Sequence, residues 1–98
     1  MEKSSLFGVN LGWFLYIIQA KNGNLYTGVT TEVARRVKQH SGEISGGAKF
    51  FRGNPPKYFW VIGEFKNRSL AQKEESRIKK MSRNAKKELI SRETRNPC

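Results

Sequence analysis

The chain has 98 residues, which suits one domain near the smaller sizes that fold around a single hydrophobic core. It carries 19 Lys and Arg against 8 Asp and Glu, a formal net charge of +11, and such an excess favours a polyanionic partner, nucleic acid first. A single cysteine, Cys98, excludes an internal disulfide and a cysteine metal site. No apolar run approaches the length of about 20 residues that spans a membrane, and no signal-peptide core begins the chain. We therefore expect a cytoplasmic protein without a membrane partner.

The N-terminal third predicts a tail followed by a β-hairpin. Residues 1–12 show neither a strand period nor a helix period, so we expect a loosely attached tail. Trp13–Ile18 is almost continuously apolar, aromatic and β-branched, as a central strand covered on both faces should be. The turn signal Asn22-Gly23 follows, and we expect Leu25–Thr30 to return antiparallel to the first strand.

Side-chain alternation constrains the loop of this hairpin. A two-residue turn over 22–23 would place Tyr16 and Tyr26 on opposite faces of the sheet. A three-residue loop over 22–24 instead pairs Tyr16 with Thr30 and places both tyrosines on one face. We favour the three-residue loop, which is a common hairpin type with Gly or Asn in the left-handed conformation.

A helix is predicted next, over residues 32–40, with Thr31 as its N-cap. At about 100° per residue, Arg36 and His40 fall on the same inward stripe as Val37. One interpretation, weighed equally, makes Arg36 a side chain that snorkels from the edge of the stripe and His40 a satisfied core histidine. Because the two residues face a strand pair that presents two tyrosines, we favour a functional site.

The segment 41–56 is rich in Gly, Ser and Pro and predicts a loop. Phe50 and Phe51 in its middle should anchor it to the body of the protein. Lys49 and Arg52 could then contact a nucleic-acid phosphate backbone. Ordinary solvated charges are an equally good interpretation of these two residues.

The C-terminal part predicts a third strand and two helices. Tyr58–Phe65 is again nearly continuous in aromatic and β-branched residues. Ser69–Met81 shows helical spacing, with Ser69 and Gln72 as a capping box, and Ser82–Ile90 predicts a short helix with Ser82 as its N-cap. Residues 91–98 predict a frayed polar tail.

Two adjacent glutamates lie in the longer of these helices. Periodicity places Glu74 near the centre of the apolar stripe, together with Leu70, and Glu75 beside Ala71 at its edge. One of the two carboxylates should therefore lie at the boundary of the core, and the periodicity alone would place Glu74 deeper.

An ordered set of short motifs resembles the GIY-YIG nuclease domain, most closely its small stand-alone members. The set comprises Phe14-Leu15-Tyr16, Tyr26-Thr27-Gly28, Arg36, His40, GAKFFRG (Gly47–Gly53), RSLA (Arg68–Ala71) and ESRIKKM (Glu75–Met81). It covers residues 13–90, most of the chain. The first motif reads FLY in place of GIY and keeps the tyrosine.

The resemblance implies an α+β fold, a three-stranded antiparallel sheet flanked by helices in the order β-β-α-β-α-α, which agrees with the elements expected above. Residues 13–90 would form this domain. The resemblance also implies a metal-dependent endonuclease, with Mg²⁺ or Mn²⁺, that hydrolyses DNA phosphodiester bonds in DNA repair or maintenance. The implied site residues are Tyr16, Tyr26, Arg36, His40 and Glu75, with Glu75 as the metal ligand and Gly28 packing closely behind the site.

Phosphodiester hydrolysis needs an activated water, a stabiliser for the phosphoryl charge, and a proton or Lewis acid at the leaving oxygen. Glu75 would hold the metal ion, and Arg36 would grip the scissile phosphate with its planar donors. Tyr26, and with it Tyr16, would orient or deprotonate the water, and the sequence does not choose between them as the base. His40 would hold a tyrosine hydroxyl or relay a proton.

Two other functions are consistent with parts of the sequence. A nucleic-acid-binding module with a silent site explains the charge equally well, but binding alone does not need the Arg36-His40 pair or Glu75. A function as a structural interaction protein would not explain the net charge of +11. The DNA could be branched or single-stranded, and a partner protein could supply specificity to so small a domain.

Overall fold

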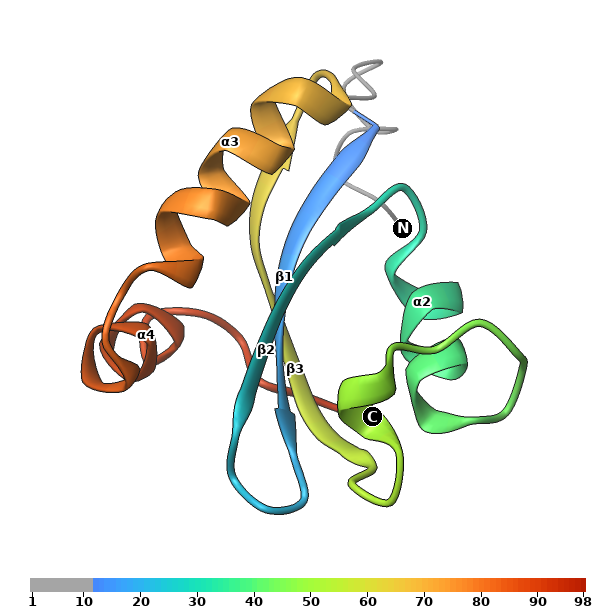
Figure 1. The fold of residues 1–98 in the computed structure, drawn as a ribbon. Coiled ribbons are helices and arrows are strands. Elements are labelled where there is room, and N and C mark those ends of the chain that lie inside the picture. Colours follow the sequence, from blue (N-terminus) through green and yellow to red (C-terminus); the bar gives the residue numbers. More distant parts are fainter. Residues whose placement is uncertain (1–11) are drawn as a thin grey trace.

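The apolar run predicted as the central strand forms β1 (Trp13–Ala20), which pairs antiparallel with β2 (Leu25–Thr30) on one side and β3 (Pro56–Phe65) on the other. The remaining elements are α2 (Val33–Ser41), the 3₁₀ turn η1 (Lys49–Phe51), α3 (Arg68–Lys79), α4 (Arg83–Ile90) and β4 (Asn96–Pro97). The computed structural model describes residues 12–98 (Figure 1). The expected α+β architecture is confirmed, and the predicted N-terminal tail lies outside the described residues except for Gly12.

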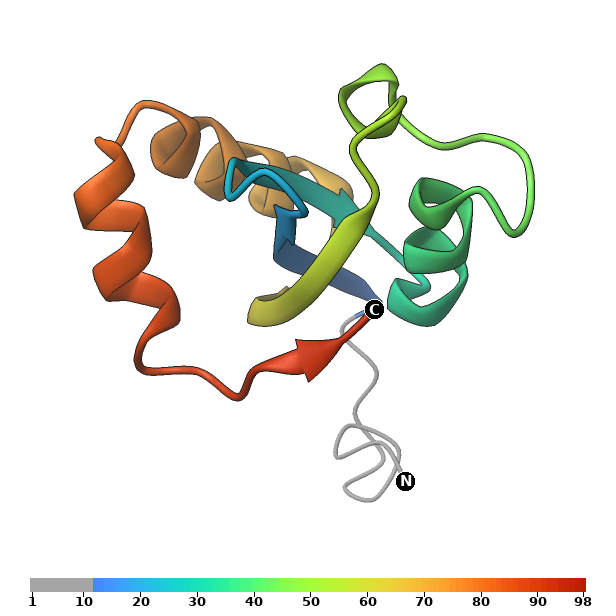
Figure 2. The ribbon, with the colours of Figure 1, turned by 90° about the horizontal axis from the view of Figure 1, so that it is seen from below.

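The sheet separates two hydrophobic cores. Leu15 and Ile17 of β1 point to the face that α3 and α4 cover, whereas Tyr16 and Ile18 point to the face that α2 and η1 cover, as successive side chains of a strand must. Figures 1 and 2 show these two layers of helices on opposite sides of the sheet. Buried partners on the first face are Trp60, Ile78 and Ile90, and on the second Ala20, Val37 and Phe51.

The hairpin has the predicted loop length but a different register. Ala20 closes the loop with Asn24, so the three loop residues are 21–23 rather than 22–24. Gly23 has a positive φ of 91° at the third loop position, where the common three-residue hairpin places a left-handed residue. Tyr16 therefore pairs with Gly28, two residues from the Thr30 expected, and both tyrosines still share one face because a shift by two preserves side-chain direction.

The two N-caps expected for the longer helices are wrong by one or two residues. Glu32, not Thr31, is the N-cap of α2, and the Thr30 hydroxyl accepts from its backbone N–H at 3.1 Å. Asn67, not Ser69, caps α3, because the Asn67 side chain accepts from the backbone N–H of Leu70. Leu70, which was expected on the apolar stripe, is 45% exposed, and the buried residues of α3 are Ala71 and Ile78.

The C-terminal residues form a fourth strand instead of the frayed tail that we expected. β4 pairs antiparallel with the edge of β3, and the Asn96 amide donates to the Phe59 carbonyl at 3.2 Å. The guanidinium of Arg95 lies 4.2 Å from the centroid of the Tyr58 ring. These contacts extend the sheet to the order β2-β1-β3-β4, and Figure 2 shows β4 beside β3. Among residues 12–98, no helix is long and apolar enough to cross a membrane.

Candidate active site

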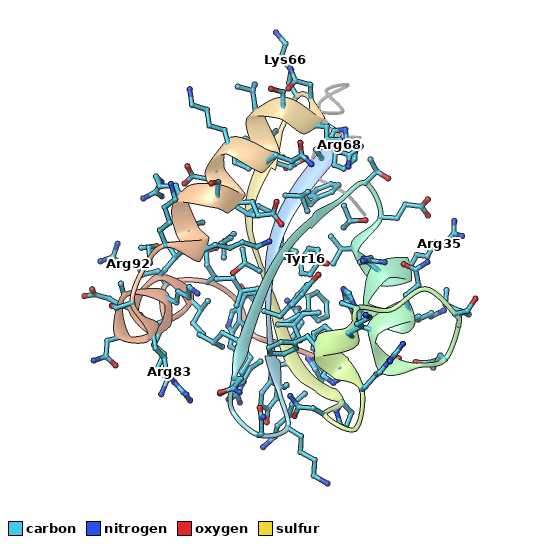
Figure 3. The ribbon with its side chains drawn as sticks, in the orientation of Figure 1. Tyr16, Arg35, Lys66, Arg68, Arg83 and Arg92 are labelled. Atoms are coloured by element: carbon cyan, nitrogen blue, oxygen red, sulfur yellow. The ribbon has the colours of Figure 1, made fainter. Side chains whose placement is uncertain are left out.

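Tyr16 lies at the centre of the predicted site, in the layer between the sheet and α2 (Figure 3). Its side chain is 1% exposed, and its hydroxyl forms a hydrogen bond of 2.9 Å with Nε2 of His40. Burial raises the pKa of the Tyr16 phenol to about 12; the nearby Arg36 guanidinium opposes this rise, and Tyr26 and Glu75 add to it. His40, Arg36 and Tyr26 thus surround this phenol, and the charge of Glu75 has a smaller effect on its pKa.

The two hydrogen-bond partners of His40 determine which of its ring nitrogens carries the proton. The backbone N–H of Ala48 donates to Nδ1 at 3.2 Å, so Nδ1 carries no proton. In a neutral imidazole the proton then resides on Nε2, which donates to the Tyr16 hydroxyl. Burial and the charge of Arg36 lower the pKa of His40 to about 4. The histidine is therefore neutral at physiological pH, and the proton of the Tyr16 hydroxyl points away from it.

Tyr26 of β2 lies beside this pair and is only partly buried. Its ring centroid is 5.1 Å from that of His40 and 6.3 Å from that of Tyr16. Phe50 and Phe51 of η1 contact it from the other side, with centroids at 5.4 and 5.1 Å. The two phenylalanines thus anchor the loop, as expected, and do so on the site itself.

Arg36 is half-buried on α2, and the loop after the helix holds it. One guanidinium nitrogen donates to the Gln39 side chain and to the Gly46 carbonyl, both at 2.8 Å. Gly47 then passes so close to α2 that a Cβ there would lie 3.0 Å from the Cα of His40. The Gly46-Gly47 pair therefore lets the loop fold back and fix both helix residues of the site.

Glu75 reaches the site from α3, on the other face of the sheet. Its side chain is 18% exposed and lies 3.3 Å from the Lys79 ammonium. Glu74, which periodicity placed deeper, is 33% exposed and pairs with Arg77. The relative depth expected from the apolar stripe is therefore wrong, because the buried face of α3 is formed by Ala71 and Ile78, and Glu75 shares this face through its spacings of four and three residues. The deeper carboxylate is the one that influences Tyr16.

Gly28 lies directly opposite Tyr16 in the hairpin. A Cβ at this position would approach the Cζ atom of the Tyr16 ring to 2.6 Å, a separation that real side chains do not adopt. The absence of a side chain at Gly28 is thus what allows the phenol to lie across β2.

Lys49 and Arg52 flank the two anchoring phenylalanines, and both side chains are exposed. They stand on either side of the phenylalanine pair that contacts Tyr26, a position that suits contacts with a polyanion at the site.

The donor set suits a hard divalent cation better than zinc. Glu75 offers one carboxylate, and no cluster of three or more His, Cys, Asp or Glu side chains forms within residues 12–98. Structural or catalytic zinc needs three or four protein ligands. Mg²⁺ commonly takes one or two carboxylates and completes its shell with water and phosphate oxygens, so the residues present fit that ion.

Three contacts of the site were missed in the sequence. Gln39 stands three residues after Arg36, a spacing that could have suggested their hydrogen bond, and the glycine pair 46–47 is a signal of close backbone approach. The N–H of Ala48 carries no signal of its own, because its contact with His40 depends on the path of the loop.

Comparison with known proteins gives one consistent result. A family model described as the GIY-YIG catalytic domain matches residues 12–88. A UPF0213 protein of Citrobacter koseri is 42% identical over 79 residues, 81% of this chain and 77% of the relative. The UPF0213 protein YhbQ of Escherichia coli O127:H6 is 41% identical with the same shares. The solution structure of a UPF0213 protein from Bacillus halodurans is 37% identical, covers 81% of this chain and 82% of that one, and has a TM-score of 0.45.

Proposed function

Because the chain belongs to the GIY-YIG catalytic domain family, we propose that it is a metal-dependent endonuclease that hydrolyses DNA phosphodiester bonds, in DNA repair or maintenance. The observation that carries the proposal is the convergence on Tyr16: His40 binds its hydroxyl, and Arg36, Tyr26 and Glu75 all act on its pKa. A module that only bound nucleic acid would not need a buried phenol, a neutral histidine and a carboxylate at one point.

Each side chain has a definite task in this mechanism. Arg36, already oriented by Gln39 and Gly46, contacts the scissile phosphate and stabilises the charge that develops on its oxygens. Glu75 would hold Mg²⁺ or Mn²⁺, and such an ion would supply Lewis-acid chemistry at the phosphate and the leaving oxygen. Lys79, the exposed partner of Glu75, can move aside when the cation binds.

The tyrosines have different tasks because their burial differs. Removing a proton from Tyr16 is unfavourable, since its pKa is raised to about 12. Tyr26 is more exposed, and we assign it the role of base for the attacking water. Tyr16 receives a hydrogen bond from His40 and directs its own proton outward, so it positions the water or a phosphate oxygen. In this assignment His40 orients Tyr16 and does not relay a proton.

A cleavage assay with matched variants tests the proposal. Plasmid and single-stranded circular DNA are incubated with Mg²⁺, with Mn²⁺ or with a chelator. We expect Glu75→Gln to reduce the rate at least about a hundredfold, the order typical for loss of an essential electrostatic group. Glu74→Gln and Glu88→Gln, which remove a partly exposed and an exposed carboxylate outside the site, should keep the rate within a factor of about two.

Two outcomes would contradict the proposal. Equal cleavage by the natural protein and Glu75→Gln would place the activity elsewhere. Binding without cleavage under all metal conditions would favour the nucleic-acid-binding module, whose affinity the net charge of +11 supports equally well.

A further inference from the structure

A polar pocket lies beside the proposed active site, where β2 ends between the start of α2 and the start of α3. The side chains that line it include Trp13, Thr30, Arg35, Arg36, Gln39 and Arg68. Since Arg36 also belongs to the active site, the pocket and the site are contiguous. In Figure 3, Arg68 lies above Tyr16 near the start of α3, and Arg35 lies to the right of Tyr16, on α2.

The pocket combines positive charge with a flat aromatic surface. Arg35, Arg36 and Arg68 outnumber the one acidic lining residue, Glu32. The guanidinium of Arg68 lies 5.8 Å from the centroid of the Trp13 ring, which is partly exposed. Arg35 and Arg68 are themselves exposed, so their charged groups are accessible to a ligand.

These features match the two chemical parts of a nucleotide. Nucleic-acid bases stack on aromatic rings and on planar guanidinium groups, and a phosphate accepts hydrogen bonds from arginine. In a duplex, both faces of each internal base are already covered by neighbouring bases. Away from the ends of a duplex, only an unpaired nucleotide can offer a free face to Trp13 and Arg68.

We propose that this pocket holds one unpaired nucleotide next to the scissile phosphate, its base stacked on the Trp13–Arg68 pair and its phosphate bound by Arg35. Arg68 and Glu75 stand seven residues apart on α3, two turns or roughly 10 Å along the helix, so the nucleotide lies near the bond that is cut. The substrate is then DNA with an unpaired segment at the cleavage point. This inference rests on the proposed function for the cut, but the pocket itself can be tested without cleavage.

Tryptophan fluorescence in the presence of a chelator tests the pocket. We expect a short single-stranded oligothymidylate to quench the emission to saturation, and a blunt duplex of equal length or inorganic phosphate to leave it nearly unchanged. Trp60 is only 5% exposed, so Trp13→Phe should abolish the quenching while fluorescence anisotropy of a labelled strand still reports binding. Trp13→Leu should weaken that binding about tenfold, the order measured for loss of one stacked base.

Charge variants separate the pocket from general attraction to DNA. For single strands, each phosphate contact contributes about 0.7 to the slope of log affinity against log salt. Arg35→Ala should lower the slope by about that amount. Arg92→Ala removes an exposed charge from the turn that follows α4 (Figure 3) and should leave the slope unchanged.

The proposal fails if the blunt duplex quenches as strongly as the single strand, or if Arg92→Ala lowers the slope as much as Arg35→Ala. Failure of the two proposals is distinguishable. Selective quenching without cleavage under any metal condition supports the pocket and rejects the nuclease. Cleavage of single strands without a response of Trp13 supports the nuclease and rejects the pocket.

Discussion

Tyr16 serves two purposes, because it fills the core under α2 and presents its hydroxyl to the site. Its ring is almost fully buried, and its hydroxyl has His40 as a partner. A buried hydroxyl without a partner would cost about 1–3 kcal/mol, so the histidine makes it possible to keep the phenol inside. In the proposed mechanism, stability and catalysis would both depend on this hydrogen bond.

At Gly28, we predict that substitution by Ala disturbs the site through Tyr16. The added Cβ would meet the Tyr16 ring, and overpacking of this kind costs about 1–3 kcal/mol. Urea denaturation should show that loss in the natural background and much less of it in Tyr16→Ala, because the clash is then absent. An equal loss in both backgrounds would show that the two residues are not coupled.

At His40, we predict a loss of stability on mild acidification. Its folded pKa, about 4, lies below the ordinary value of 6.5, so the unfolded chain binds the proton more readily. The contribution is fully present above about pH 6.5, is lost as the pH falls towards 4, and is constant below that value. From about pH 7.5 to about pH 5 the loss should be about 2 kcal/mol.

The variant His40→Gln is the control for this pH effect. His40 is the chain's one histidine, and glutamine does not titrate. The difference in unfolding free energy between the two proteins should therefore shrink by the same amount over this range. A constant difference would show that His40 does not remain neutral in the folded state.

At the scale of the elements, the strands and helices could be predicted from the sequence, but their connections could not. The run Trp13–Ile18 predicts β1 because it is an uninterrupted series of apolar, aromatic and β-branched residues. Asn22-Gly23 predicts a turn but does not determine which residues form the closing pair. The predicted hairpin register was therefore wrong by two residues, since Tyr16 pairs with Gly28 instead of Thr30. Asn67 and Ser69 are both good caps, and the choice between them depends on how the chain leaves β3.

The site was predictable to the same extent. Helical spacing brought Arg36 and His40 to one stripe, and strand alternation brought Tyr16 and Tyr26 to one face. The contacts that orient these residues come from the Gly46 carbonyl and the Ala48 N–H. Backbone groups look alike in every sequence, so contacts of this kind follow only from the folded path of the loop.

For β4, we predict that the Asn96 side chain anchors the last strand. Its amide donates to the carbonyls of Phe59 and Thr94, both at 3.2 Å. Asn96→Ala should lower the free energy of unfolding by about 1 kcal/mol, a typical value for such a hydrogen bond. Thr94→Ala, which truncates an exposed side chain, should change it by less than about 0.5 kcal/mol. Similar losses in both variants would contradict this role of Asn96.

At the scale of the whole molecule, the net charge of +11 favours association with any nucleic acid. Such attraction is long-ranged and weakens with salt. It does not choose a substrate, and our proposals assign that choice to the groups around Tyr16 and to the pocket next to them.

We predict that Lys49 and Arg52 contribute specifically to DNA binding, through direct contacts with phosphates. Replacing both by serine should lower the slope of log affinity against log salt by about 1.8 for duplex DNA, if each contacts one phosphate. Salt titrations of binding measure the slope. Replacing Lys87 and Arg92 on the α4 side of the molecule, which are equally exposed, is the matched control. An equal decrease in both double variants would make all four ordinary surface charges.

Because β1 is buried on both faces, its amide hydrogens should exchange with solvent more slowly than those of the loop that holds Arg36. The four consecutive residues Leu15–Ile18 are all buried, and β1 pairs with β2 on one side and β3 on the other. Their amide hydrogens should therefore exchange with solvent only when the whole domain unfolds. The loop that clamps Arg36 is exposed over residues 41–47, and its amides should exchange through small local openings. Tyr16 thus lies on a strand that should open only with the whole domain. The hydrogen bond between Arg36 and the Gly46 carbonyl should break and reform many times before that strand opens once.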